Sequence, residues 1–129
     1  MKYKVMIVED QTMPRELFEL RIQASEHFEV ALSIDNAALA DVYCLRFPVD
    51  LILMDVVTRN GESGLDAAER IKRAFPQIKI IIVTSMPECS YLSRAREIGV
   101  ESFWYKEEQR ESLLDVMERT MNGESVYPG

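Results

Sequence analysis

The chain has very few of the residues that build disulfide scaffolds and zinc sites. Among its 129 residues there are two cysteines, Cys44 and Cys89, and a single histidine, His27. Cysteines this far apart, with no C-x-x-C spacing and no histidine cluster, indicate neither a disulfide framework nor a zinc centre. Both thiols are therefore expected to be reduced and partly buried.

Long apolar runs are also missing. The longest are LILM and IIIV, far shorter than the roughly 20 residues that a membrane-spanning helix needs. The N-terminal stretch MKYKVMIVED reaches acidic residues before the apolar part of a secretion signal is complete. These features favour a cytoplasmic protein without a membrane partner.

Positive charge is in the minority. The chain has 15 Lys and Arg against 22 Asp and Glu, a formal net charge of −7. A surface that binds DNA neutralises phosphates, so this balance argues against DNA as a direct partner of the segment. The length of 129 residues suits one domain, and 47% hydrophobic with 29% charged residues is typical of a globular fold.

Short apolar runs alternate with stretches of helical periodicity along the chain. The runs predict strands at 4–8, 28–34, 50–55, 79–85 and 101–106. The intervening stretches predict helices from Pro14 to Ala24, on the spacing of Leu17 and Leu20, and over 36–46, 64–75, 89–99 and 109–122. This alternation is typical of an α/β domain with a parallel sheet and right-handed crossovers.

Charged and hydroxyl side chains stand at the ends of four predicted strands. They are Glu9 and Asp10, Asp55, Thr84 and Ser85, and Lys106. Because ligands of such sheets bind beyond the carboxyl ends of the strands, these residues should share one site. Three carboxylates about 5 Å apart repel one another by roughly 3 kcal/mol per pair, so a cation must lie among them. Oxygen ligands in a site open to water suit Mg²⁺.

The segments VMIVEDQ, DLILMDV, IIIVTS and GVESFWYK contain these residues. They resemble the strand signatures of CheY-like receiver domains of response regulators, and they follow the family's order over nearly the whole chain. The resemblance implies a single-domain (βα)5, flavodoxin-like, doubly wound parallel sheet with strand order 2-1-3-4-5. It also implies a protein of two-component signalling. Such a protein catalyses only its own phosphorylation and dephosphorylation and is not otherwise an enzyme.

The resemblance gives roles to the residues that would handle phosphate. Asp55 matches the residue that accepts a phosphoryl group from a sensor histidine kinase. Lys106 matches the phosphate-binding lysine, and Thr84 matches the switch hydroxyl. Phe103 matches the switch aromatic, although a half-buried strand aromatic is the plainer interpretation of this residue.

A metal site follows from the same resemblance. Glu9 and Asp10 match the acidic pair that binds Mg²⁺ in the family. The implied ligands are Asp10, Asp55 and the backbone carbonyl of Val57, with Glu9 acting through water.

The tail MNGESVYPG resembles the end of the last helix and the start of the linker in NarL/FixJ-type regulators. By that resemblance residues 1–122 form the receiver and residues 123–129 begin a linker. The helix-turn-helix output domain that the linker would reach is absent from these 129 residues. DNA would be bound only through that domain, and phosphorylation would favour a homodimer.

Two departures from the family pattern lie beside the expected site. The family usually has glycine eight residues after the phosphorylated aspartate, whereas Gly64 comes nine after Asp55, so the loop is expected to be one residue longer. Lys106 is followed by Glu107 instead of proline. A cis bond before a residue other than proline costs about 2.5 to 4 kcal/mol, so none is expected here.

Two other functions remain open at this stage. An aspartyl-phosphate hydrolase of the haloacid dehalogenase type also uses a strand-end aspartate with Mg²⁺. That family needs a second aspartate two residues later, where this chain has Val57. The altered loop after Asp55 favours instead a receiver-like docking module that acts without phosphorylation. Phosphoryl uptake on Asp55 separates this module from a signalling receiver.

Overall fold

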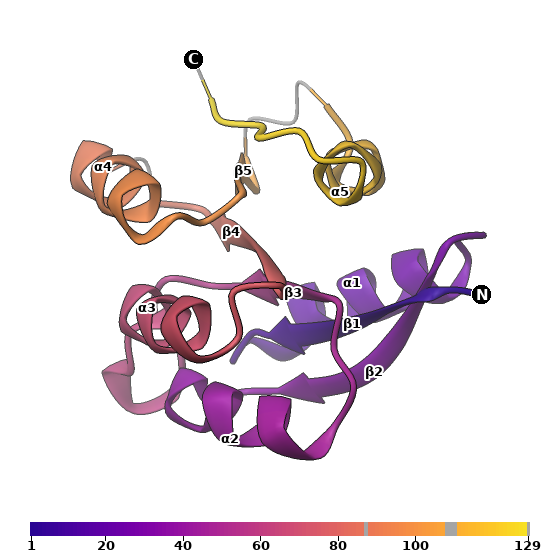
Figure 1. The fold of residues 1–129 in the computed structure, drawn as a ribbon, viewed down its shortest axis with the longest axis horizontal. Coiled ribbons are helices and arrows are strands. Elements are labelled where there is room, and N and C mark those ends of the chain that lie inside the picture. Colours follow the sequence, from indigo (N-terminus) through magenta and orange to yellow (C-terminus); the bar gives the residue numbers. More distant parts are fainter. Residues whose placement is uncertain (87, 108–110, 129) are drawn as a thin grey trace.

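Within the described part of the chain, five parallel strands form one sheet in the order β2-β1-β3-β4-β5 (Figure 1). The computed structural model describes residues 1–86, 88–107 and 111–128. The strands are β1 (Tyr3–Val8), β2 (Phe28–Ile34), β3 (Leu51–Met54), β4 (Lys79–Thr84) and β5 (Ser102–Tyr105). The predicted flavodoxin-like strand order is confirmed. The inner strands read as continuous apolar runs because helices cover both of their faces.

The helices lie on the two faces of the sheet (Figure 1). On one face are α1 (Thr12–Gln23) and α5 (Leu113–Met121), and on the other are α2 (Ala40–Arg46), α3 (Gly64–Ala74) and α4 (Cys89–Ile98). A 3-10 turn, Ala37–Leu39, leads into α2 and forms the first part of the helix predicted over 36–46. The helix predicted over 109–122 is α5, but residues 109 and 110 lie outside the described residues. None of the described helices is long and apolar enough to cross a membrane.

The buried face of α1 differs from the one that its leucines suggest. Phe18 and Ile22, four residues apart and so on one side of the helix, are 4% and 1% exposed, whereas Leu17 and Leu20 are 50% and 62% exposed. The helix also begins earlier than predicted, which makes Pro14 its third residue instead of its first. This position is tolerated because the first N–H groups of a helix have no partner within it.

The two cysteines differ in their surroundings. Cys44 is buried against the sheet, and Cys89 is exposed at the start of α4; both are free. The expectation of partial burial is therefore wrong for Cys89, because the first turn of α4 faces solvent.

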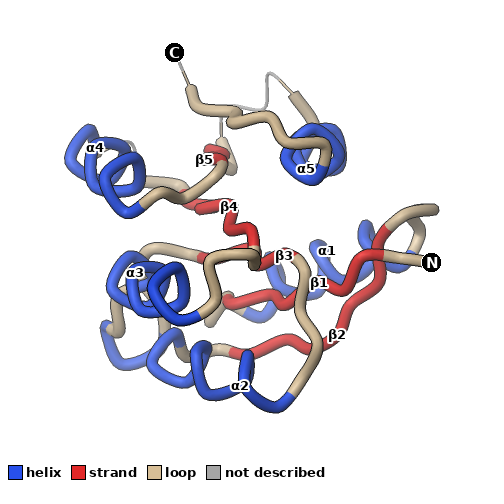
Figure 2. The backbone as a smooth tube through the Cα atoms, in the orientation of Figure 1, coloured by secondary structure: helices blue, strands red, loops and turns tan. Residues whose placement is uncertain are grey.

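The residues after α5 turn back along β5, the last strand of the sheet (Figure 2). The N–H of Phe103 donates to the carbonyl of Val126 at 2.9 Å, and the N–H of Val126 donates to Ser102 Oγ at 3.1 Å. The hydroxyl of Tyr127 donates to the carbonyl of Val100 at 2.6 Å. This segment therefore supplies hydrogen-bond partners, from its backbone and from a side chain, along the outer side of the edge strand β5.

Candidate functional site

Hydrogen bonds of the sheet continue one residue past three strand ends and fix the backbone of the candidate site. The N–H groups of Glu9, Asp55 and Lys106 donate to the last residue of the neighbouring strand at 2.9, 3.0 and 2.9 Å, respectively. Residues held by the ends of neighbouring parallel strands lie at one edge of a sheet. The backbone thus brings two acids and a lysine to the same place.

Three carboxylates gather at this edge. Glu9, Asp10 and Asp55 each offer an oxygen, and these atoms lie within 4.8 Å of one another. Glu9 is fully buried and Asp55 is 9% exposed, while Asp10 is partly exposed. Such a set of hard oxygen donors, with one side reached by water, has the chemistry that Mg²⁺ prefers.

Lys106 bridges two of the acids. Its Nζ lies 2.5 Å from Glu9 Oε1 and 3.3 Å from Asp55 Oδ2. Burial works against the charged ammonium, but the hydrogen bonds and negative charges of the two carboxylates outweigh burial and raise the pKa of Lys106 above its ordinary value. The bond from Lys106 to Glu107 is trans, as is every peptide bond among the described residues.

Burial is the main influence on the protonation of Asp55. Burial, and then the nearby charge of Glu9, raise the pKa of Asp55 to about 7, while Lys106 works in the opposite direction. Its Oδ1 also accepts a hydrogen bond from the N–H of Val56 at 2.8 Å. Further positive charge at this edge would therefore stabilise the ionised, nucleophilic form of the carboxyl group.

Thr84 and Phe103 are both buried. Thr84 is 1% exposed, and its Oγ1 accepts from the N–H of Met86 at 3.1 Å. Phe103 is 2% exposed, so it is more deeply buried than the half-buried aromatic that the sequence suggested. The centroid of its ring lies 5.3 Å from that of Tyr105 and 6.2 Å from that of Tyr127.

The loop between β3 and α3 is a miniature hairpin. The N–H of Gly64 donates to the carbonyl of Val56 at 2.7 Å, and the N–H of Thr58 donates to the carbonyl of Glu62 at 2.9 Å. Val57 and Ser63 face each other between these two bonds as an isolated antiparallel bridge. In such a pair the residue's own carbonyl points away from the opposite arm, so Val57 directs its oxygen out of the hairpin.

Two contacts at the site were not predicted. A Cβ atom on Gly64 would lie 1.7 Å from the backbone oxygen of Asp55, so the glycine packs directly against the backbone of this residue. The displaced glycine in the sequence was a signal of this contact. Arg15 donates from Nη1 to the carbonyl of Glu9 at 2.9 Å. Nothing in the linear sequence distinguishes Arg15 from the other arginines.

The molecule is thus a doubly wound parallel sheet whose strand ends carry an acidic cluster, a buried threonine and a lysine. Residues 5–118 match the family model of the response regulator receiver domain, and the chain belongs to this family. The family resemblance seen in the sequence is therefore confirmed.

Similar proteins support the assignment. The chain is 31% identical over 127 residues to the response regulator protein VraR of Staphylococcus aureus, covering 98% of the chain and 60% of VraR. It thus spans less than two thirds of that relative. A LuxR-family DNA-binding response regulator of Staphylococcus aureus has a TM-score of 0.83 at 25% identity, over 92% of this chain and 98% of that one. The isolated receiver of RcsB from Salmonella enterica, with a phosphomimetic, has the same fold (TM-score 0.89, 17% identity, 99% and 94% coverage).

Proposed function

We propose that Asp55 accepts a phosphoryl group and that the resulting change of conformation controls an output domain. The observation that carries this proposal is the approach of Lys106 Nζ to both Glu9 and Asp55, within an acidic cluster whose oxygens lie within 4.8 Å. A carboxylate nucleophile beside a fixed ammonium group is suited to phosphoryl transfer, in which the protein chiefly positions and neutralises.

The acids at this edge fit Mg²⁺ because they supply hard oxygen donors and an excess of negative charge. Asp10, Asp55 and the carbonyl of Val57 would hold the ion, with Glu9 acting through a water molecule. When bound there, Mg²⁺ would supply positive charge that neutralises phosphoryl oxygens.

The chain's own residues perform the transfer. An Asp55 carboxylate oxygen attacks the phosphorus of a phosphohistidine, the P–N bond breaks, and the imidazole leaves with the bonding electrons. Lys106 and the hydroxyl of Thr84 then hold the phosphoryl oxygens through charge-assisted hydrogen bonds. This contact draws Thr84 and the β4-α4 loop inward and biases the position of Phe103. Phosphorylation and dephosphorylation of Asp55 are the only reactions assigned to the chain.

The proposed partners follow from the same function. A sensor histidine kinase in the cytoplasm supplies the phosphoryl group, and residues 1–122 act as the receiver. Residues 123–129 begin the linker to a helix-turn-helix output domain, through which DNA is bound and transcription is regulated; Gly129 lies outside the described residues. Phosphorylation favours a homodimer of the chain.

Acetyl phosphate, a small phosphodonor, tests the assignment by intact-mass spectrometry. Wild type should gain one phosphoryl mass with Mg²⁺ and none in excess chelator, and Asp55→Asn should gain none. Asp41→Asn, which changes a partly exposed carboxylate on α2, is the matched control and should label like wild type. Labelling of Asp55→Asn would show that Asp55 is not the phosphoryl acceptor. Unlabelled wild type would favour the phosphorylation-independent docking module.

A further inference from the structure

The hairpin between β3 and α3 has a well-defined turn at its tip. The tip is a single 3-10 turn, Arg59–Gly61, in which Asn60 and Gly61 adopt φ angles of 62° and 71°. Asparagine and glycine are the residues that enter this left-handed region most readily. The two positive φ angles close the hairpin in a tight turn, and this turn brings Arg59 to a neighbouring loop.

Thr58 and Arg59 fasten the hairpin to the connection between β2 and α2. The N–H of Arg59 donates to the carbonyl of Asp35 at 3.0 Å, and its guanidinium group pairs with the Asp35 carboxylate. The N–H of Ala37 donates to Thr58 Oγ1 at 2.9 Å, and Thr58 is 2% exposed. Thr58 Oγ1 in turn donates to the carbonyl of Glu62 at 3.0 Å, across the hairpin. We call these contacts of Asp35, Ala37, Thr58 and Arg59 the loop anchor.

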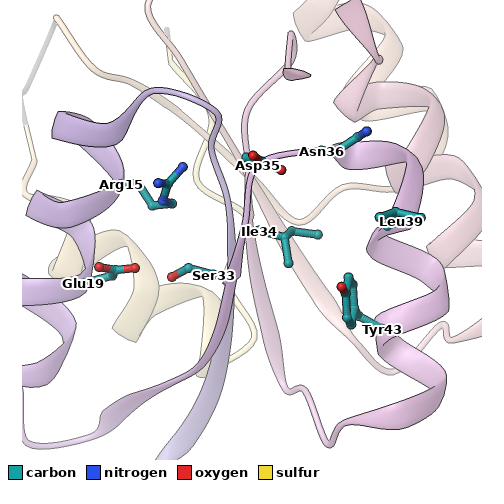
Figure 3. A pocket seen from close by; sticks show the side chains of 8 residues that line it. All are labelled: Arg15, Glu19, Ser33, Ile34, Asp35, Asn36, Leu39 and Tyr43. Atoms are coloured by element: carbon teal, nitrogen blue, oxygen red, sulfur yellow. The ribbon is translucent and has the colours of Figure 1, made fainter. Parts of the chain in front are cut away.

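Asp35 stands next to the backbone that holds the acidic cluster. It follows Ile34, whose carbonyl accepts the N–H of Glu9 at 2.9 Å. Figure 3 shows Asp35 at the end of β2, between the helix that carries Arg15 and the turn that begins at Asn36. The hydrogen bond from Arg59 holds the pKa of the Asp35 carboxyl group below its usual range, so this group is ionised at neutral pH.

From this geometry we infer that the loop anchor is a positioning device for the metal site. It fixes the arm of the hairpin that carries Val57, and so fixes the carbonyl oxygen that Val57 directs out of the hairpin. Thr58 and Arg59 immediately follow Val57 in the chain, and both of their anchoring contacts reach the same β2-α2 connection. The inference rests on the proposed function, because it takes Val57 as a ligand of Mg²⁺.

Replacing Arg59 distinguishes an effect of charge from an effect of positioning, because the two predict opposite changes in Mg²⁺ affinity. Removing its positive charge near the acids would tighten Mg²⁺ binding if only electrostatic potential mattered, and removing the Asp35 charge would weaken it. If the anchor positions Val57, then loss of either partner weakens Mg²⁺ binding. The variant Thr58→Val changes no charge and removes only the hydroxyl group that accepts from Ala37 and donates to Glu62.

Titration of the whole chain with MgCl₂ by isothermal calorimetry tests the inference, with folding checked by circular dichroism. We expect Arg59→Met, Asp35→Asn and Thr58→Val each to weaken Mg²⁺ binding on the order of tenfold. Thr58→Ser restores the hydroxyl group and should bind like wild type. Arg70→Met is the control, because it removes an exposed arginine whose partner, Asp41, lies outside the anchor.

The outcomes separate the inference from the function on which it rests. Unchanged or tighter binding by Arg59→Met overturns the anchor as a positioning device, even if wild type binds Mg²⁺ and Asp10→Asn does not. Wild type that binds no Mg²⁺, or an Asp10→Asn variant that binds it equally well, overturns the metal site and the inference together. Should Thr58→Val fail to fold, Arg59→Met still decides, since the Arg59 side chain is 64% exposed.

Discussion

Glu9 and Lys106, 97 positions apart in the chain, form an ion pair of 2.5 Å in which the carboxylate is completely buried. Removing one partner of such a pair leaves a buried charge without compensation. We expect Lys106→Met to lower the free energy of unfolding by about 3 to 5 kcal/mol at neutral pH. Urea unfolding in excess chelator measures this change.

Lys4→Met is the matched control for this prediction. Lys4 pairs with Glu29 at 2.6 Å, but both side chains are more than 40% exposed. Water screens exposed pairs and leaves them little net stabilisation, so this substitution should have a small effect. Equal losses of stability in the two variants would contradict the special position of the pair between Glu9 and Lys106.

Asp55 should make the metal-free protein less stable as the pH rises. Its pKa is about 7 in the folded chain against an ordinary value of 3.8. Between these values the folded state keeps a proton that the unfolded state has released, so stability falls with increasing pH. The stabilisation is fully present below the lower value and is lost as the pH passes through the higher one.

Asp55→Asn removes this titration. We expect the variant to be more stable than wild type at neutral pH, and to lose less stability than wild type from about pH 4 to pH 7. The midpoints of urea unfolding, measured for both proteins across that pH range in excess chelator, test this expectation. If the stability of the two proteins changed with pH in the same way, Asp55 would not hold its proton in the folded state.

The sequence predicted the gathering of Glu9, Asp10, Asp55 and Lys106 at one edge of the sheet better than it predicted the contacts around them. The ends of the strands can be located in the sequence because apolar runs stop at polar residues, and a parallel sheet must bring those ends to one edge. The buried face of α1 was ambiguous, since Leu17 and Leu20 fit one helical stripe and Phe18 and Ile22 another. Packing against the sheet decides between such stripes, and the periodicity of a single helix does not contain that information.

The contacts of the loops and of the tail could not be predicted for a related reason. Arg59 meets Asp35, and Val126 meets Phe103, only because the folded sheet brings distant segments together. Neither pair has a characteristic spacing in the sequence. The place of Gly64 predicts a longer loop after Asp55, and Asn60 followed by Gly61 is a common hairpin signal, but the attachment of the hairpin to the β2-α2 connection depends on contacts that form only in the folded chain.

Gly64→Ala should disturb the site through the backbone of Asp55. The new Cβ would lie 1.7 Å from the Asp55 carbonyl oxygen, so the hairpin or the strand end must move. We expect a destabilisation of roughly 3 kcal/mol, at the upper end of the usual cost of overpacking, and slower phosphoryl uptake from acetyl phosphate. Urea unfolding and the time course of labelling measure the two effects.

Gly99→Ala serves as the control for this substitution. Its Cβ would meet nothing within 4 Å, and only its φ of 92° is unfavourable for alanine. This variant should lose about 1 to 2 kcal/mol of stability and label at the wild-type rate. Wild-type labelling by Gly64→Ala would show that the close approach to Asp55 does not matter for phosphoryl uptake.

Thr84→Ala should separate phosphoryl uptake from the conformational response. The Thr84 hydroxyl gains its phosphoryl partner only after transfer, so the variant should label at close to the wild-type rate. It should show much smaller backbone chemical-shift changes at Phe103 when Mg²⁺ and beryllofluoride, a phosphoryl mimic, are added. Ser85→Ala removes an exposed neighbouring hydroxyl and should respond like wild type. A full response in Thr84→Ala would refute the role of this hydroxyl.

The phosphorylated form should be long-lived, because the positions that help to orient a hydrolytic water in the family carry apolar side chains. These are two residues after the acceptor and two after the switch threonine, here Val57 and Met86, which are 45% and 42% exposed. Neither side chain can hold an attacking water in line through a strong hydrogen bond. Val57→Asn and Met86→Glu should speed the loss of phosphate, by up to about a hundredfold. Mass spectrometry after donor removal times the decay; loss from wild type within seconds, or no acceleration in either variant, would contradict this account.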